Sequence, residues 1–458
     1  MRLIDEFQHV LSESFADTFS QERSRVRATE LALGMLCSYG RRTISRSLCA
    51  VGRIHQDWSA DYKLFSRSPW ETEPLADPVI AEYTQRYPHG PIGVLMDDTK
   101  LGKRGRHIPT AFWQRDPLSP PFHLNLLFGL RFMQASLAFP HYREGDFSAR
   151  GFPIRFVECP AVKKPGKRAT PEQQKAYREA IKVQNLSYQG LGVMKELRER
   201  FDLLGYFGRR MLSVVDGSLC NRVIFRNLLD RVDIVARCRK DARLCFPAPE
   251  GSRRFYGEES FSPEAVRKDK TIPWKNARCY YGGAWHKVRY KEISDVLWQG
   301  GAGRRPVRLL VLAPLSYKTS AHSRIYYRQP AYLLTTDLES SARLLLQYYL
   351  DRWQIEVNHR DEKDILGVGQ AQVWSRKSVP RQPAFVVACY SLLLLAALRC
   401  FGPGRTHDFV PLPRWRKKAR RPSALDLITL LRKEINERPT NLTPNHNFTQ
   451  NIALHAYT

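Results

Sequence analysis

Short apolar runs alternate with helical stretches in the first half of this chain, and this alternation constrains the fold more than any other feature. Strand-like runs occupy residues 92–96, 123–139, 154–159, 211–215 and 232–236. Between them the sequence predicts one long helix over 170–201, with Thr170 as the N-cap and Pro171 at the first helical position. A shorter helix is predicted over 221–229. Strands and helices in this order predict an α/β fold.

The α/β pattern stops near Lys240 and returns near residue 331. Residues 240–330 are rich in glycine, aromatic and basic residues, which predicts a mostly β insertion. A strand-like run at 331–335, a long helix over 338–366 and an apolar helix follow. The predicted divisions are an N-terminal helical domain (1–75), the first half of a core (76–239), the β-rich insertion (240–330), the second half of the core with the long helix (331–405) and a basic C-terminal segment (406–458).

The N-terminal domain contains two predicted short helices between residues 22 and 52, joined by a turn at Gly40. Two helices around a glycine-containing turn, with Arg41 and Arg42 beside it, are typical of a small DNA-binding module. An ordinary helical cap on the main domain explains the same pattern. The sequence leaves both interpretations open.

A large positive charge limits the class of partner. The 458 residues include 73 Lys and Arg against 45 Asp and Glu, a formal net charge of +28. This excess favours a polyanion, either a nucleic acid or an anionic membrane surface. The longest apolar run, 384–398, is shorter than the roughly 20 residues that span a membrane, so we expect a buried core helix there. Because the N-terminus lacks the pattern of a signal peptide, we expect a cytoplasmic protein without a membrane partner.

The nine cysteines are scattered, and no Cys-x-x-Cys pair occurs. We therefore expect reduced, mostly buried thiols rather than a disulfide framework or a structural zinc site. The sequence also lacks a phosphate-binding loop ending in Gly-Lys-Ser/Thr, so it does not imply the use of ATP.

Residues 349–363 carry the pattern with the most chemical information. On a helix with about 100° per residue, four polar residues fall within an arc of about 60°: Tyr349, Arg352, Glu356 and Lys363. An apolar stripe on a neighbouring face is formed by Leu346, Leu350, Trp353 and Val357. We expect this stripe to be buried and the polar residues to lie at its edge. An amphipathic helix explains the apolar stripe, but it does not explain a carboxylate aligned with Tyr, Arg and Lys.

Three acidic residues stand at the ends of predicted strands. Asp97 and Asp98 follow the run that ends at Met96, and Asp216 follows the run 211–215. Acids in such positions lie at the rim of a sheet, where α/β proteins place their chemistry. Together with Glu356 they offer the oxygen ligands that Mg²⁺ prefers, and two such ions about 4 Å apart suit phosphoryl transfer. A single strand-end Asp is more often a turn or cap residue, so only the combination supports a metal site.

The four polar residues of the helix have the spacing Tyr-x2-Arg-x3-Glu-x6-Lys, which matches the YREK signature and resembles bacterial insertion-sequence DDE transposases of the cut-and-paste kind. Asp97-Asp98-Thr99 looks like the Asp-x-Thr of the first core strand in that group, and residues 100–105 are similar to one branch of it. Residues 214–217 resemble the setting of its second catalytic aspartate. The resemblance implies a ribonuclease-H-like mixed sheet flanked by helices, often with a β insertion before the glutamate.

The resemblance also implies a metal-dependent DNA transposase. Asp97, Asp216 and Glu356 would be the catalytic residues and would hold two divalent ions, Mg²⁺ or Mn²⁺, with Asp98 as the alternative first ligand. The implied reaction is hydrolysis of a phosphodiester at the transposon end, followed by in-line attack of the freed 3′-hydroxyl on target DNA.

The remaining signature residues would bind DNA. Arg352 and Lys363 would hold phosphates near the cleavage point, and Tyr349 would contact the same backbone. Part of this family cleaves through a hairpin with a flipped base, for which three tryptophans of the insertion are candidates: Trp274, Trp285 and Trp298. A structural role is the more common one for each.

The partners that the resemblance implies are double-stranded DNA, both as inverted-repeat transposon ends and as target, and a second copy of the chain on that DNA. The expected location is the bacterial cytoplasm, in association with the nucleoid. Two alternatives stay open: a related nuclease that cleaves without strand transfer, and a former transposase retained as a non-catalytic DNA-binding protein. The complete set of three acids argues against the second.

Overall fold

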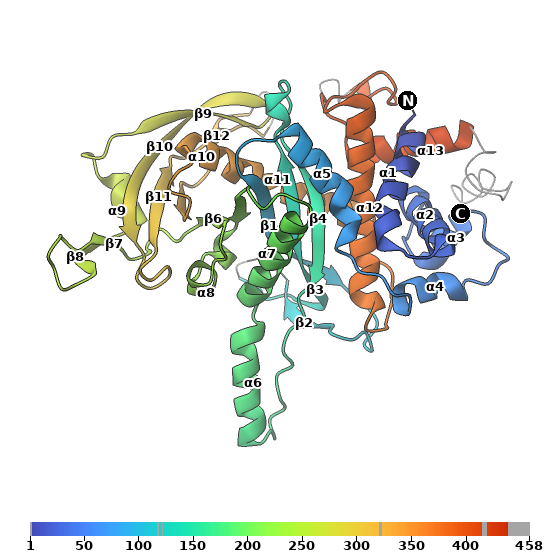
Figure 1. Cartoon of the computed structure of the whole chain (residues 1–458), viewed down its shortest axis with the longest axis horizontal. Coiled ribbons are helices and arrows are strands. Elements are labelled where there is room, and N and C mark those ends of the chain that lie inside the picture. The colour runs from blue at the N-terminus through green and yellow to red at the C-terminus, as the bar shows by residue number, and fades with distance from the viewer. Residues whose placement is uncertain (1, 117–118, 121, 320–322, 415–418, 438–458) are drawn as a thin grey trace.

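A large mixed sheet flanked by helices forms the centre of the molecule (Figure 1). The structure, a computed structural model, describes residues 2–116, 119–120, 122–319, 323–414 and 419–437. Its 12-stranded sheet has the order β2-β3-β1-β5-β6-β14-β11-β10-β7-β8, with β4 paired to β3 and β9 paired to β10. The strands of this sheet are β1 (Ile92–Gly102), β2 (Phe112–Arg115), β3 (Leu126–Phe139), β4 (Arg150–Glu158), β5 (Met211–Val215), β6 (Val232–Arg237), β7 (Leu244–Pro247), β8 (Tyr256–Phe261), β9 (Lys275–Tyr281), β10 (Ala284–Leu297), β11 (Pro306–Leu312) and β14 (Ala331–Thr335). The predicted α/β class is confirmed.

In the first half of the sheet, β3 pairs antiparallel with β2, β4 and β1, and β1 is followed by β5 and β6, which run parallel to it. Every residue of β5 and of β14 is buried, and both strands have the bounds that their apolar runs predict. The predicted end of the first strand at Met96 is wrong. β1 stops pairing with β5 at Met96 but continues beside β3 to Gly102, so Asp97 and Asp98 lie within the strand.

The segment predicted as a β-rich insertion contributes strands β7 to β11 and the short helix α9 (Pro263–Lys268). β10 and β11 are hydrogen-bonded into the main sheet through β14. Two short strands, β12 (Ser316–Tyr317) and β13 (Tyr326–Tyr327), form a separate sheet. Much of this segment therefore extends the core sheet edgewise.

Helix α12 (Ser378–Phe401) lies between the sheet and most of the N-terminal helices (Figure 1). It packs on β4 and on α1, and one continuous apolar core joins the sheet, α12 and the N-terminal helices. These helices are α1 (Leu3–Thr18), α2 (Glu22–Cys37), α3 (Ile44–Ala50), α4 (Ser59–Ser66), η1 (Pro74–Ala76) and α5 (Asp77–Arg86), and α13 (Ala424–Glu437) packs beside them. The predicted pair of helices around Gly40 is confirmed as α2 and α3.

Helix α12 is longer than the apolar run that predicted it. Among the described residues, α12 alone has the length and composition of a membrane span. However, 78% of its most apolar stretch is buried inside the protein. The predicted buried core helix is therefore confirmed. The cysteines are free thiols, and most of them are buried in the same way.

The helix predicted over 170–201 is two helices. α6 (Pro171–Gln184) begins with the predicted cap, because Thr170 and Gln173 form a capping box. It ends at Asn185, whose side chain accepts hydrogen bonds from the backbone of Ser187 and Tyr188 and so starts α7 (Leu186–Leu203). α7 packs on the core, whereas α6 has no buried residue and projects away from the sheet (Figure 1).

The helix predicted over 338–366 is also divided. α10 (Ala342–Asp351) is followed, after the single residue Arg352, by α11 (Trp353–Arg360), and the π-helical segment η4 (Asp361–Ile365) completes it. Arg352 keeps right-handed helical dihedral angles, so α10 and α11 remain nearly continuous. The wider π turn changes the direction in which its residues, including Lys363, project from the helix axis.

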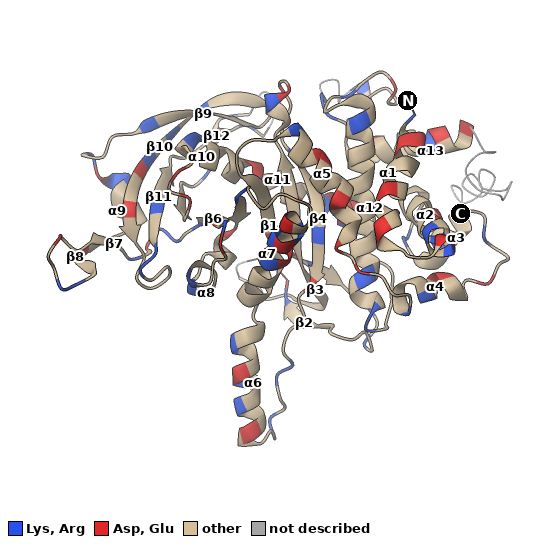
Figure 2. Cartoon of the chain, in the orientation of Figure 1, with Lys and Arg blue, Asp and Glu red and all other residues tan. Residues whose placement is uncertain are grey.

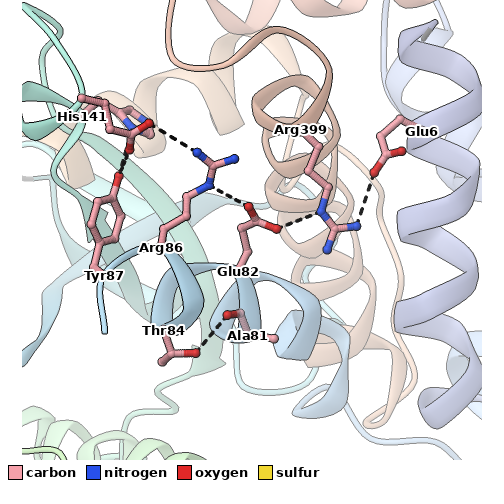
Figure 3. A network of polar contacts seen from close by, with 9 residues as sticks. Glu6, Ala81, Glu82, Thr84, Arg86, Tyr87, His141 and Arg399 are labelled. Atoms are coloured by element: carbon pink, nitrogen blue, oxygen red, sulfur yellow. Dashed lines mark hydrogen bonds and ion pairs between the residues drawn. The ribbon is translucent and has the colours of Figure 1, made fainter. Parts of the chain in front are cut away.

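Ion pairs connect the N-terminal helices to α12 (Figure 3). Arg399 of α12 donates to Glu82 of α5 over 2.9 Å, and to Glu13 and Glu6 of α1 over 3.0 and 3.3 Å. Glu82 also accepts from Arg86 over 2.7 Å. Because both Glu6 and Glu82 are largely withdrawn from water, this network orients α1 and α5 on the core.

Candidate active site

The two predicted catalytic aspartates lie side by side at the same level of the sheet. Met96 of β1 pairs with Val215 of β5 in parallel, so the next residues, Asp97 and Asp216, occupy neighbouring positions. Asp97 lies inside its strand, whereas Asp216 directly follows the end of β5. Burial is the main cause that raises the pKa of Asp97, and the nearby charge of Asp216 adds to it, as expected for close carboxylates.

Arg352 connects Asp97 to Glu356. One guanidinium nitrogen, Nη1, is 3.4 Å from Asp97 Oδ2, and the other, Nη2, donates to Glu356 Oε1 over 3.0 Å. Glu356 lies one turn after Arg352 on α11, and its side chain is 35% exposed. Burial raises the pKa of Asp97 to about 6, and the neighbouring Arg352 opposes that shift. Two of the three predicted metal ligands are thus held by one arginine.

Asp98 belongs to the opposite face of the sheet. Successive side chains of a strand point to opposite faces, and Asp98 forms an ion pair of 2.7 Å with Arg131 of β3. Asp97 instead shares its face with Gln134, its partner on β3. The structure therefore directs Asp97, rather than Asp98, towards Arg352 and α11.

The other two signature residues occupy different surroundings. The pKa of Tyr349 is raised by burial, and both Arg352 and Asp216 act on it, so the phenol lies within the same cluster. The pKa of Lys363 is lowered by burial, while acidic neighbours that include Asp98 oppose the change. Lys363 belongs to the π-helical turn, so the ideal helical spacing that aligned it with Glu356 does not hold there.

The buried face of this helix differs from the predicted apolar stripe. Trp353, a member of that stripe, is 51% exposed, whereas Ile355 is buried. Polar residues are buried too: Asn358 accepts from Ser136 of β3 over 3.1 Å, and Glu362 accepts from Gln134 over 2.8 Å. The sequence pattern failed here because the sheet presents polar partners at this position, which lets polar helix residues turn inward.

Sequence reasoning overlooked Arg237, the last residue of β6. Val215 pairs with Ala236, so Arg237 stands beside Asp216 on the next strand, and its charge acts on Tyr349. Its position directly after the apolar run 232–236 was a usable signal, because residues after neighbouring parallel strands share one sheet edge.

A cleft of about 570 Å³ lies between the β-rich segment and residues 350–354, the part of the glutamate helix that adjoins Arg352 along the chain. Trp353 and Tyr317 line it, and the guanidinium of Arg328 lies 5.6 Å and 5.7 Å from their ring centres. Exposed aromatic rings with a cation between them offer stacking surfaces, and Trp353 stands three residues before Glu356 on the same helix.

The three tryptophans considered for base stacking are packed against the protein. Trp285 stands edge-on to Tyr280 and Tyr142, and its Nε1 donates to Asp146 over 3.2 Å. Trp298 packs on Phe225. Trp274 lies under Arg289 and Lys291. Each therefore has a structural role in this conformation, and Trp353 is the tryptophan that faces the cleft.

The cluster has the ligand chemistry for divalent ions, but its carboxylates are not gathered. Asp97, Asp216 and Glu356 supply the oxygen atoms that Mg²⁺ prefers. Among the described residues, no three Asp, Glu, His or Cys side chains converge closely enough to hold a metal ion. The reason is local, since Arg352 binds both Asp97 and Glu356. The residue types fit the ions, and the guanidinium provides the positive charge between the carboxylates in this conformation.

Comparison with known proteins adds no assignment, because neither a protein-family model nor a curated protein matches this chain. The arrangement of the residues is therefore the basis for a function.

Proposed function

We propose that this chain is a DNA transposase of the DDE cut-and-paste kind. The observation that carries the proposal is the position of three acids from distant parts of the chain around Arg352 and one edge of the sheet. Asp97 and Asp216 lie at one level of two parallel strands, and Glu356 is joined to Asp97 through Arg352. Carboxylates from two central strands and one helix, on a chain of charge +28, suit metal-dependent phosphoryl transfer on DNA.

Asp97, Asp216 and Glu356 would hold two divalent ions, Mg²⁺ or Mn²⁺. Such ions, when bound, activate the attacking oxygen and stabilise the leaving one. Arg352 must release at least one carboxylate when the ions bind, and its guanidinium is then free to hold a phosphate in two parallel hydrogen bonds. In this proposal Arg352 neutralises the carboxylates before the metal and DNA arrive, and it positions the DNA afterwards.

Further cations surround the acids and would hold the DNA backbone. Arg237 lies beside Asp216, and Arg328 lies over Trp353 at the neighbouring cleft. Lys363 and Tyr349 complete the set that the signature assigns to DNA. Three antiparallel strands followed by two parallel ones, with the glutamate helix beside them, support a ribonuclease-H-like core for this site.

The expected partners are the two transposon ends, a target duplex and a second copy of the chain. Two ends must be cut and joined in concert, so each requires its own set of three acids. A related nuclease would need the same acids but no bound target, and it is distinguished by the product that forms.

The direct test is Mg²⁺-dependent cleavage of DNA containing the inverted repeats that flank the coding sequence. We expect the wild-type protein to nick or cut at the repeat end and to join the 3′ end to a second duplex. Glu356→Gln should lower cleavage at least 100-fold while DNA binding persists, because the amide loses the charge that binds the metal.

Glu250→Gln, in the exposed turn between β7 and β8, is the matched control and should leave cleavage unchanged. Cleavage without joining would favour the nuclease. If both variants and the wild type bind these ends without cutting them, the enzymatic proposal is wrong and a retained DNA-binding protein is the better description.

A further inference from the structure

A second hollow lies apart from the acids, between the N-terminal helices and the loop that leads into α12. Its volume is about 620 Å³. Helices α3 and α4 form one wall, and residues 371–378 form the other. The floor is apolar, with Ile44, Phe65 and Val373 buried beneath it.

Both walls of this hollow are held in place. The backbone N–H of Arg42 donates to Gln370 Oε1 over 2.7 Å, which joins the α2–α3 turn to the loop. Lys103, nearly fully buried after β1, donates from Nζ to the carbonyl oxygens of Gly369 and Ala371, each over 2.8 Å. The hollow is therefore preformed, and its loop wall is fastened to the strand that carries Asp97.

The lining has the chemistry of a nucleotide site. Trp374 is 74% exposed at the rim, and Tyr62 is a second exposed aromatic residue. Arg41 and Arg67 are exposed beside them, and hydroxyl groups come from serine and threonine residues. Of the described residues that line the hollow, none is acidic. An aromatic platform with flanking arginines binds unpaired nucleotides, because every base has a face that stacks and every linkage has a phosphate.

We propose that this hollow binds an unpaired nucleotide of a DNA strand, with the base stacked on Trp374 and the adjoining phosphates held by Arg41 and Arg67. The inference rests on the proposed function, which supplies DNA as the partner. The segment from η4 to α12 carries Lys363 at one end and Trp374 near the other, so the hollow is only a few residues along the chain from a proposed DNA-binding residue. A displaced strand beside a cut end is the expected occupant.

The test uses the Glu356→Gln protein, so that binding is measured without cleavage. A duplex with a single-stranded extension carries one 5-iododeoxyuridine in the extension, and irradiation links that base to a stacked aromatic side chain. We expect the crosslinked peptide to contain Trp374. Trp374→Ala should weaken binding of the extended DNA about tenfold and leave binding of the blunt duplex within twofold. Arg41→Ala with Arg67→Ala should also weaken binding of the extended DNA.

Trp113→Ala is the matched control, because Trp113 is 67% exposed on β2 and does not line the hollow. Equal binding by the Trp374 and Trp113 variants, or a crosslink outside residues 371–378 and α4, overturns the inference. Competition by polyglutamate as strong as by oligothymidylate would also overturn it, in favour of an acidic peptide. If the wild type cleaves DNA but Trp374→Ala binds the extended DNA normally, the inference is wrong and the proposed function stands. If Trp374 is crosslinked but the wild type does not cleave DNA, only the proposed function is wrong.

Discussion

At the scale of single residues, the site depends on the contacts that Arg352 makes with both Asp97 and Glu356. The guanidinium lies within 3.4 Å of one carboxylate and 3.0 Å of the other. Desolvation raises the pKa of Asp97 to about 6, despite that positive charge. Arg352 thus stabilises the charged form of Asp97 only in part. The carboxyl group of Asp97 is therefore protonated within an experimentally accessible pH range.

Cleavage should therefore require more Mg²⁺ at low pH. Below about pH 6 Asp97 holds a proton in the metal-free protein, and each pH unit lowers its charged fraction about tenfold. We expect the Mg²⁺ concentration for half-maximal cleavage to be constant from pH 7 to 8 and to rise steeply between pH 6 and 5. A constant value down to pH 5, measured in single-turnover reactions, would contradict this.

Glu362 offers a test that does not depend on activity. It is fully buried beside Gln134, and burial raises its pKa to about 8, above the ordinary value of 4.5. The folded state therefore holds a proton that the unfolded state releases above pH 4.5. Stability should be full below about pH 4.5 and should decline as the pH rises to about 8.

Glu362→Gln should flatten that decline, because the amide keeps a neutral group of the same shape. We expect the wild type to lose on the order of 3 kcal/mol relative to this variant between pH 5 and 8, measured by urea unfolding. Parallel profiles for the two proteins would show that Glu362 is ionised in the folded state.

At the scale of elements, α6 and the basic loop before it form an arm that projects from the molecule, and α6 buries none of its residues. Figure 2 shows charged residues along the helix. The loop carries four cations: Lys163, Lys164, Lys167 and Arg168. A 14-residue helix of this kind adds little to stability, so we expect the charge of this arm to act on a partner outside the chain.

Replacing these four loop residues with Gln should weaken DNA binding without lowering the melting temperature. Each phosphate contact contributes about 0.9 to the slope of log K against log salt, so the slope should fall by up to about 4. Lys433→Gln, an exposed change on α13, should leave the slope unchanged. An unchanged slope in the loop variant would show that the arm does not contact DNA.

At the scale of the whole molecule, the N-terminal helices and the sheet behave as one packed body. A continuous apolar core runs from α1 through α12 to the sheet, and Arg399 binds acids of α1 and α5 across it (Figure 3). Loss of this arginine removes the cation beside the poorly hydrated Glu6 and leaves Glu82 with Arg86.

Arg399→Ala should lower the free energy of unfolding by about 2 kcal/mol. Because the core is shared, we expect one shifted urea transition rather than early release of the N-terminal helices. The exposed Arg376→Ala is the control and should change stability by less than about 0.5 kcal/mol. A separate first transition in Arg399→Ala would mean that the N-terminal helices are an independent domain.

The sequence by itself determined the order of strands and helices and the identity of the acids. The strands at 211–215 and 331–335 and the cap at Thr170 follow from local patterns, because apolar runs and capping residues act within a few positions. Tertiary structure decided how those pieces meet. Pairing with β3 carried β1 past Met96, and the sheet's polar partners turned Glu362 inward.

The same division holds at the site. The sequence supplied Asp97, Asp98 and Arg352, but only the pairing of strands directed Asp97 to α11 and left Asp98 with Arg131. The same pairing places Arg352 between two carboxylates, and the spacing of residues along a helix cannot predict its contact with Asp97. Local patterns report which secondary structure each segment prefers. The charged partner of Asp97, in contrast, comes from a segment more than 200 residues away.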